Sequence, residues 1–512
     1  MKAGVFFSAA VFLLAAALTV HAQDDFGFGF GFSEDEGGAA SSGNNGSASI
    51  AAGASVHGKA QAELLFFAEE FRSKDAIGNI QPGNIFSGEL NFSAGGSNAD
   101  GVINLKLRPD FQDPAKILSL DEAYVRAFFG NFNIEGGLRK LTWGKADSLG
   151  PLDVINPLDY SDLSAMSDVQ SIKISRPLLH ASYSIGPFTK IEGVFVPWFE
   201  GHRFAHSGRW AASQMTEFQE AVSARFAPQF GMLPGLGIND PPPSIDSAQV
   251  TIDTSTLEYA QGGLRFTTTA GSSDIGVQYY SGFLPRPAVV LNQQGISDLT
   301  GNIASYAAVI FSSGTSDEDK DSARNSIRTI LASLKAQNVV ATAYNRCHQI
   351  GLDYAQVIAG FNLRAEMAAN ITEDLKGDDG LVYNPSVAWS LGFDRDIAAG
   401  INVNLQVNEN IMLLNNKTDA DILNDIEAGS DVTDTRLTLT LSKKFLRDEL
   451  ELRATGIWGI EDMDYYILPA LIWTKGDTAV ELSGGVFAGN PDGGLGQYRD
   501  NGFIKAALSC SF

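Results

Sequence analysis

The C-terminal segment of the chain alternates between apolar and polar residues and ends on an aromatic residue. From Ile504 to Phe512 apolar residues occupy every second position, and Lys505, Ala507, Ser509 and Ser511 lie between them. A period of two is that of a β-strand with one apolar and one polar face. The segment therefore predicts a terminal strand whose two faces meet different environments.

The N-terminal sequence predicts a cleaved export signal, and the alternative is a retained helical anchor. Lys2 supplies a positive charge, residues 5–20 are apolar, and Val20-His21-Ala22 offers small residues for cleavage. No later apolar run is long enough for a membrane helix. An exported chain of this kind, ending on a strand with a terminal Phe, resembles bacterial outer-membrane β-barrels. The resemblance implies that Phe512 is an assembly signal read by the barrel-assembly machinery, and that the barrel lies in outer-membrane lipid.

The composition agrees with a barrel and argues against nucleic acid as a partner. Hydrophobic residues make up 44 % of the chain and the mean hydropathy is −0.02, as expected when only alternate strand residues face lipid. The net charge of −24 argues against nucleic acid as a partner. Cys347 and Cys510 are predicted at opposite ends of their strands, too far apart for a disulfide.

The chain divides into three parts. We interpret residues 1–22 as the signal peptide and 23–49 as a periplasmic leader rich in Gly, Phe and acids. The alternative for the leader is a strand of four alternating phenylalanines that plugs the lumen or adds to an edge. Residues 50–512 predict an all-β, transmembrane antiparallel β-barrel of about 18 strands, with 16 also compatible. The candidate strands are 53–69, 84–95, 99–109, 118–130, 132–143, 170–186, 187–198, 254–268, 272–284, 350–361, 362–372, 384–394, 399–412, 432–445, 448–460, 463–475, 478–488 and 500–512.

The connections between these strands alternate between short and long. Short periplasmic turns and longer outer loops are typical of such barrels. The longest predicted outer loops are 144–169, 199–253 and 285–349. The last contains helical spacing over 317–337 and a shorter helical stretch over 303–312. This loop either folds over or into the pore, or forms a solvated crown.

One hairpin, residues 118–143, predicts its own register. A two-residue turn places Glu122 opposite Arg139 and Arg126 opposite Glu135, with Tyr124 between them on the same face. A one-residue slip would turn these charges toward lipid, so we expect this face to line the lumen. The ladder either stiffens the wall or forms a polar stripe that tunes the passage of solute.

A motif follows this hairpin. Trp143-Gly144 ends a basic strand, and Asn156-Pro157-Leu158-Asp159 comes after it. Over residues 118–198 this resembles a family of porin-like outer-membrane proteins that are in turn similar to alginate-export-type channels. Pro157 cannot continue a strand ladder. Lys145, Asp147 and Asp159 would then lie near the mouth, either lining an eyelet or forming plain loop surface.

Catalytic and metal-binding patterns are weak. His202 and His206 have helical spacing but no intervening Glu, as a zinc protease helix would require. The acidic run 317–321 is followed by Ser322 where a calcium loop needs Gly, and by Arg328 where it needs Glu. We therefore expect no enzyme, no catalytic residue, no metal and no cofactor.

The predicted function is a porin-like channel for diffusion or selective uptake of an unknown small solute. A barrel of this size leaves an aqueous lumen unless a segment fills it. Arg453 and Lys505 are further pore-lining candidates, and Asn402, Asn404 and Gln406 would wet the same space. Two alternatives remain. One is a surface adhesin whose loops 199–253 and 285–349 bind a partner, and the other is a long-chain fatty-acid-type transporter. The sequence does not specify the oligomeric state.

Overall fold

The computed structural model describes residues 53–68, 86–108, 117–166, 169–239, 252–333, 339–415 and 420–512. The predicted signal peptide and leader lie outside the described residues. Among the residues that the structure describes, no helix is both long and apolar enough to cross a membrane.

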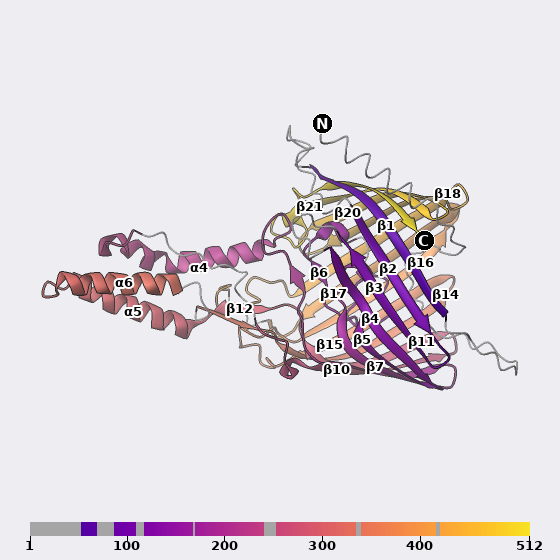
Figure 1. Ribbon diagram of the computed structural model, residues 1–512, viewed down its shortest axis with the longest axis horizontal. Coiled ribbons are helices and arrows are strands. Elements are labelled where there is room, and N and C mark those ends of the chain that lie inside the picture. Colours follow the sequence, from indigo (N-terminus) through magenta and orange to yellow (C-terminus); the bar gives the residue numbers. More distant parts are fainter. Residues whose placement is uncertain are drawn as a thin grey trace.

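Eighteen long strands form a closed antiparallel cylinder (Figure 1). Each strand pairs with its neighbours along the chain, and the last strand closes the ring by pairing with the first, with Lys59 opposite Ser511. The barrel strands are β1 (Gly53–Phe67), β2 (Phe86–Gly95), β3 (Ala99–Leu107), β4 (Leu118–Phe129), β5 (Phe132–Arg139), β7 (Arg176–Ile185), β8 (Thr189–Val196), β10 (Gln261–Ala270), β11 (Ser273–Phe283), β14 (Arg346–Ile358), β15 (Phe361–Thr372), β16 (Ser386–Ile397), β17 (Ile401–Met412), β18 (Thr433–Phe445), β19 (Leu450–Gly459), β20 (Asp464–Lys475), β21 (Thr478–Gly489) and β22 (Phe503–Ser511). The predicted barrel of about 18 strands is confirmed.

The largest differences from the predicted strand bounds lie near the outer loops. The prediction of strand from residue 170 was wrong by six residues, because α3 (Val169–Ile172) forms a helical turn before β7. Strand β10 begins at Gln261, because η7 (Leu257–Tyr259) occupies the predicted start. Strand β5 ends at Arg139, four residues early, because the chain there leaves the wall and enters the lumen.

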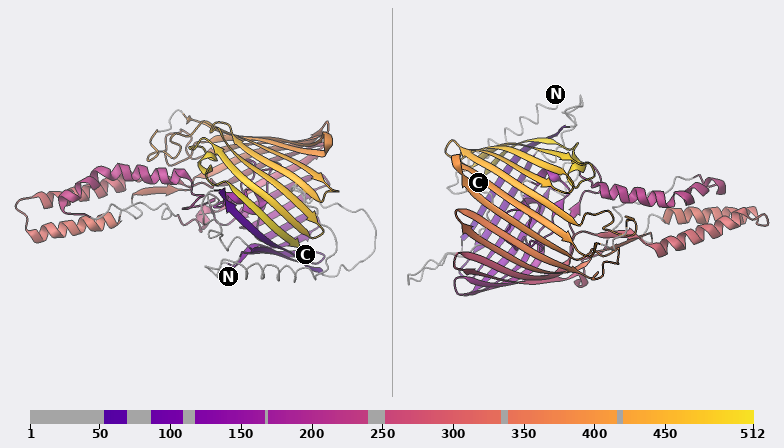
Figure 2. Two further views of the ribbon diagram at one scale, coloured as in Figure 1. Left: turned by 90° about the horizontal axis from the view of Figure 1, so that it is seen from above. Right: turned by 180° about the vertical axis from the view of Figure 1, so that it is seen from behind.

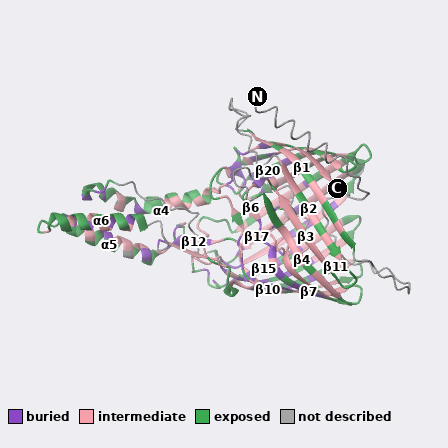
Figure 3. Cartoon of the chain, in the orientation of Figure 1, coloured by how far each residue is buried: buried purple, intermediate pink, exposed green. Residues whose placement is uncertain are grey.

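Alternation along each strand separates two environments. In β4, Val125 and Phe129 are 59 % and 64 % exposed on the outer surface, whereas Tyr124 and Arg126 face inward and are half-buried. Exposed positions recur along the barrel strands in this way (Figure 3). An apolar outer face and a polar inner face are what lipid outside and water inside require.

The two ends of the barrel differ. Short turns join the strands at one end, among them Gly130-Asn131 and Ala359-Gly360, where positive φ angles of 66° at Gly130 and 53° at Ala359 allow tight reversal. The C-terminus lies at this end (Figure 1). Long connections occupy the opposite end, so the predicted alternation of connection lengths is confirmed. The short-turn end is the periplasmic one in barrels built this way.

Three helices project from the long-loop end, as both views in Figure 2 show. They are α4 (Ser213–Met232), α5 (Gln293–Phe311) and α6 (Asp317–Ser333), and we call them the helical arm. Val222, Phe226, Ile303 and Ile327 contribute to an apolar core of their own. The helices expected within 285–349 are therefore present, and they point away from the barrel instead of into it. Helix α4 was not predicted.

Short elements connect these parts. The short strands β12 (Ala288–Leu291) and β13 (Val340–Ala343) pair with each other at the base of the helical arm. The remaining ones are β6 (Asp159–Tyr160), β9 (Arg203–Phe204), η4 (Leu163–Ala165), η5 (Pro234–Leu236), η8 (Ala398–Gly400) and η10 (Gly496–Tyr498).

Candidate functional site

Residues 140–158, which we call the inner loop, leave β5 and cross the lumen. The backbone N–H of Ala146 donates to the carboxylate of Glu366 on β15, at 2.7 Å. The N–H groups of Asp147 and Ser148 donate to Oε1 of Gln406 on β17, each at 3.1 Å. In the ring of eighteen strands β15 and β17 lie six and eight strands away from β5. The inner loop therefore spans the lumen to the far wall.

Glu366 is the central anchor of the inner loop. Its carboxylate also accepts hydrogen bonds from the N–H groups of Lys145 and, at 3.4 Å, Leu152. A Cβ atom at Gly144 or Gly150 would collide with this carboxylate. Gly144 has φ +102°, a conformation that side chains disfavour. Both glycines therefore allow the loop backbone to wrap closely around a side chain that is only 4 % exposed.

Two further contacts hold the tip of the loop. The Asp147 carboxylate forms an ion pair with Arg364 on β15 and accepts a hydrogen bond from Nδ2 of Asn404 on β17, at 2.9 Å. Arg364 also pairs with Asp394 on β16, at 2.8 Å. Nε2 of Gln406 donates to the carbonyl of Leu149, at 3.3 Å. The tip is thus bound to β15 and β17, and Arg364 links it to β16 between them.

Asn156 of the Asn-Pro motif holds the base of the inner loop. Its Oδ1 accepts from the N–H of Leu141 at 2.8 Å, and its Nδ2 donates to the carbonyls of Arg139 and Ile174 at 3.1 and 2.8 Å. The side chain therefore ties the start and end of the loop together. The motif predicted a strand break at Pro157, and this clamp on its neighbour explains why Asn precedes it.

A buried ion pair adds to the clamp. Nζ of Lys173 lies 2.6 Å from Oδ2 of Asp153, and their side chains are 1 % and 9 % exposed. Burial raises the pKa of Asp153, and the Lys173 ammonium opposes that rise. Breaking such a pair by removing one partner leaves an uncompensated charge.

The loop also packs against an apolar part of the inner wall. Trp143 is 1 % exposed and meets Tyr280 of β11 edge to face, with ring centroids 6.2 Å apart. Ile155, Leu178 and Val196 belong to the same cluster. Packing of this kind fixes one conformation, because core side chains fit at high density.

A second pair of segments, 158–166 and 203–212, pairs through β6 and β9 and contacts the end of β20 at the mouth. Tyr466 of β20 donates its hydroxyl to the carbonyl of Leu163 at 3.2 Å, and Tyr498 donates to Trp210 at 3.4 Å. His202 accepts the N–H of Leu158 at Nδ1, at 2.9 Å. Burial and the nearby Arg286 lower the pKa of His202 to about 4. The imidazole therefore serves as a neutral acceptor.

The residues predicted to line an eyelet lie in two different segments. Lys145 and Asp147 lie in the inner loop, where the backbone of the first and the carboxylate of the second are used as tethers. Asp159 lies in β6 at the mouth, where its carboxylate is 3.8 Å from Arg203. The motif thus correctly marked the segment that crosses the lumen. The charged residues of that segment mainly hold it in place.

The hairpin β4–β5 has the predicted register, with Tyr124 opposite Gly137 and Arg126 opposite Glu135. Within this register the charged residues also form ion pairs that were not predicted. Arg126 pairs with Asp100 of β3 at 2.8 Å, and Arg139 pairs with Glu135 on its own strand.

The predicted pairing of Glu122 with Arg139 fails at the end of the ladder, which stops one position earlier. There Glu122 accepts from the N–H of Lys140, where the chain leaves the wall, and from Nδ2 of Asn104 beside a β-bulge in the β3–β4 pairing.

Two ion pairs on opposite sides of the lumen differ in accessibility. Arg265 and Asp353, on β10 and β14, lie 3.0 Å apart with side chains only 6 % and 0 % exposed. On the other side, Arg453 of β19 retains 24 % and its partner Glu451 14 %. Lys505 faces inward on β22, between the exposed outer positions. We call the inner face of β1–β4 and β18–β22, with the β5 face next to β4, the open wall; it excludes the part of β20–β22 near the mouth, where Tyr466 and Phe503 are buried.

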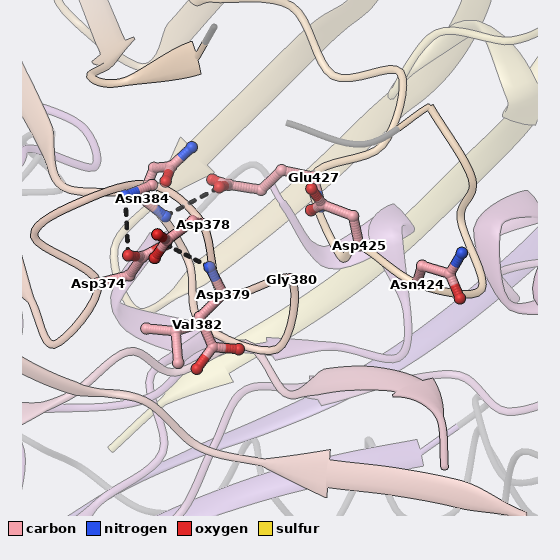
Figure 4. Close-up of a pocket in the computed structure, with 10 residues that line it drawn as sticks. Asp374, Asp378, Asp379, Gly380, Val382, Asn384, Asn424, Asp425 and Glu427 are labelled. Atoms are coloured by element: carbon pink, nitrogen blue, oxygen red, sulfur yellow. Dashed lines mark hydrogen bonds between the residues drawn. The ribbon is translucent and has the colours of Figure 1, made fainter. Parts of the chain in front are cut away.

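A small acidic cavity of about 190 Å³ lies among the outer loops (Figure 4). Asp374 accepts the backbone N–H groups of Gly377 and Asp379 at 2.8 and 3.0 Å, and Glu427 accepts that of Asn384 at 2.8 Å. Burial raises the pKa of Asp374, but the backbone N–H groups that donate to its carboxylate outweigh this effect and lower the pKa. Its carboxylate therefore stabilises a turn. Within the described ranges no group of His, Cys, Asp and Glu is arranged to hold a metal.

Sequence reasoning missed the anchors Glu366 and Arg364. Gln406 and Asn404 were expected on the inner face, and they lie there, but they bind the inner loop instead of bulk water. The sequence signals that could have identified them are the inward positions of Arg364 and Glu366 on one strand and the two glycines, Gly144 and Gly150, in the loop after β5.

A closed antiparallel cylinder with an apolar outer face defines this chain as a transmembrane β-barrel of the outer-membrane type. No family model and no curated protein match the chain.

Solved structures resemble it at low identity. Wzi of Escherichia coli, described as a carbohydrate-binding β-barrel involved in capsule assembly, has a TM-score of 0.42 at 9 % identity, covering 90 % of this chain and 85 % of that one. OccK11 of Pseudomonas aeruginosa has a TM-score of 0.41 at 9 % identity, covering 90 % and 94 %. The outer membrane channel DcaP of Acinetobacter baumannii has 0.38 at 8 % identity, covering 90 % and 97 %. The fold assignment rests on the strand pairing of this chain itself.

Proposed function

We propose that the protein is a porin-like channel of the outer membrane, whose bore is narrowed on one side by the inner loop. The observation that carries the proposal is the tethering of this loop to β15 and β17 across the lumen. A loop fixed at both base and tip limits the size of solutes that pass, because it cannot be displaced without breaking buried hydrogen bonds.

The remaining passage would run between the inner loop and the open wall. Tyr124, Arg126, Glu135 and Arg139 would line it on one side, next to the exit of the loop from β5. Arg453 and Lys505 would line it on the other. A barrel of 18 strands is wide enough to leave an aqueous channel beside one folded loop.

Reconstitution of the purified protein into planar bilayers tests this proposal. We expect discrete conductance steps, smaller than those of an 18-stranded barrel with an unobstructed lumen. Absence of any step from protein that shows the heat-modifiable gel mobility of a folded barrel would contradict the channel function.

The helical arm favours a second function, contact with another macromolecule at the cell surface. The arm has its own apolar core and projects well beyond the barrel. Transport does not require such an extension. If binding is its role, replacing residues 293–333 by a short linker should abolish adhesion and leave conductance unchanged.

A further inference from the structure

We propose that the open wall selects uncharged, hydroxyl-rich solutes of the size of a sugar over ions of either sign, because its charges are neutralised in pairs. This inference rests on the proposed channel function and adds a substrate class to it.

The pair of Arg126 and Asp100 is the clearest element of this wall. The guanidinium donates from Nε to Oδ1 at 2.9 Å and from Nη2 to Oδ2 at 2.8 Å. This two-point geometry is the strongest arrangement available to an arginine and a carboxylate. Their side chains remain 19 % and 25 % exposed, so the pair stays in contact with the lumen.

Other charges on the same wall are also paired. Lys106 and Lys140 both contact Asp121, at 3.1 and 3.0 Å, and the neighbouring carboxylate of Glu122 supplies the second negative charge. Arg453 lies 3.5 Å from Glu451. The side chains of these ion pairs are each between 11 % and 24 % exposed. Lys505 in turn interacts electrostatically with Glu63 of β1. The wall therefore offers many donors and acceptors and little uncompensated charge.

Neutral polar groups fill the positions between the pairs. Asn91 donates to Asn104, which donates from Nδ2 to Glu122 at 2.9 Å. The hydroxyls of Thr440 and Thr455 lie 3.0 Å apart on β18 and β19. Amides and hydroxyls both donate and accept, so they can replace the water around a hydroxylated solute.

Electrostatics explains why passage along the open wall disfavours ions relative to neutral solutes. An ion that enters a narrow passage gives up part of its hydration, and a wall charge of opposite sign would compensate for that loss. A closely paired carboxylate and guanidinium present little net field, so neither sign is compensated. A neutral polyol gives up only hydrogen bonds, which the wall restores.

Swelling of liposomes that contain the full-length protein tests the inference. The probes are glucose, gluconate and protonated glucosamine, which share a size and differ in charge. We expect glucose to enter faster than both ions. Faster entry of either ion would overturn the inference. Ion conductance without glucose entry would also overturn it, whereas neither conductance nor entry would overturn the channel function itself.

Single-residue variants assign the effect to a pair. Asp100→Asn leaves the Arg126 charge and should raise gluconate entry relative to glucose by about fivefold, the order expected from one unit charge near the path. Arg126→Gln should do the same for glucosamine. The double variant should return both ratios to the original values. Glu318→Gln on the exposed arm is the control, and gel mobility reports folding. Unchanged ratios in both folded single variants would refute the role of the pair.

Discussion

Removing the Glu366 carboxylate should weaken the attachment of the inner loop to the far wall. Its two short hydrogen bonds, from the N–H groups of Lys145 and Ala146, are made to a charged and buried acceptor. Hydrogen bonds of this kind contribute about 1.5–3 kcal/mol each. For Glu366→Ala we therefore expect a loss of at least about 3 kcal/mol in the free energy that holds the loop against the wall. That corresponds to an increase of about a hundredfold in the detached population.

The assay is single-channel recording in planar bilayers. Glu366→Ala should give larger and noisier open-channel current, while Glu366→Gln, which keeps one acceptor oxygen, should fall between it and the unaltered protein. Gln406 and Asp147 still hold the tip in both variants, so the barrel should assemble normally. Glu318→Ala on the helical arm is the matched control. Current and noise equal to those of the unaltered protein in folded Glu366→Ala would refute the reasoning.

Three further predictions follow from individual contacts. Lys173→Met leaves Asp153 charged and buried, which should cost about 3–5 kcal/mol and lower the temperature of the gel-mobility shift, and a Lys173→Met/Asp153→Leu double variant should recover most of it. Because the folded pKa of His202, about 4, lies below the ordinary 6.5, the unfolded segment binds the proton more readily. The free energy that keeps the mouth segments folded should thus fall by up to about 3 kcal/mol as the pH drops from about 6.5 to 4. The rate of protease cleavage in these segments should report the loss, and His202→Asn should remove the pH dependence that His202 causes. Gly58→Val should impair barrel closure, because a Cβ there collides with the ring of Phe512, whose backbone pairs with Gly58 at 2.8 and 2.9 Å; correct assembly yield is the readout, and normal yield would contradict it.

The barrel could be predicted from the sequence because each strand carries its own signal. Alternation such as that of Ile401, Val403 and Leu405 with intervening asparagines identifies both a strand and its lipid-facing side. Turn length then fixed the register of β4 and β5 without any knowledge of the rest of the fold. These features are local, so a single sequence is enough to read them.

The contacts of the inner loop are not local. Glu366 is more than 200 positions from the backbone that it binds, and alternation reports only that it faces inward. The ion pair of Arg126 with Asp100 was not predicted for a related reason, since the sequence of the β4–β5 hairpin does not show which residue of β3 lies beside Arg126. Helix α4 carries Phe218, Val222, Phe226 and Phe230 at a spacing of four, but Pro228 interrupts the pattern.

The most direct test of the central claim compares the single-channel conductance of two deletions. One shortens the tip of the inner loop at residues 145–150, and the other replaces residues 293–333 of the helical arm by a short linker. If the inner loop narrows the channel, the first deletion should raise the conductance of the folded barrel and the second should leave it unchanged. Equal conductance in the unaltered protein and the inner-loop deletion, or an increase only on removal of the arm, would contradict the account.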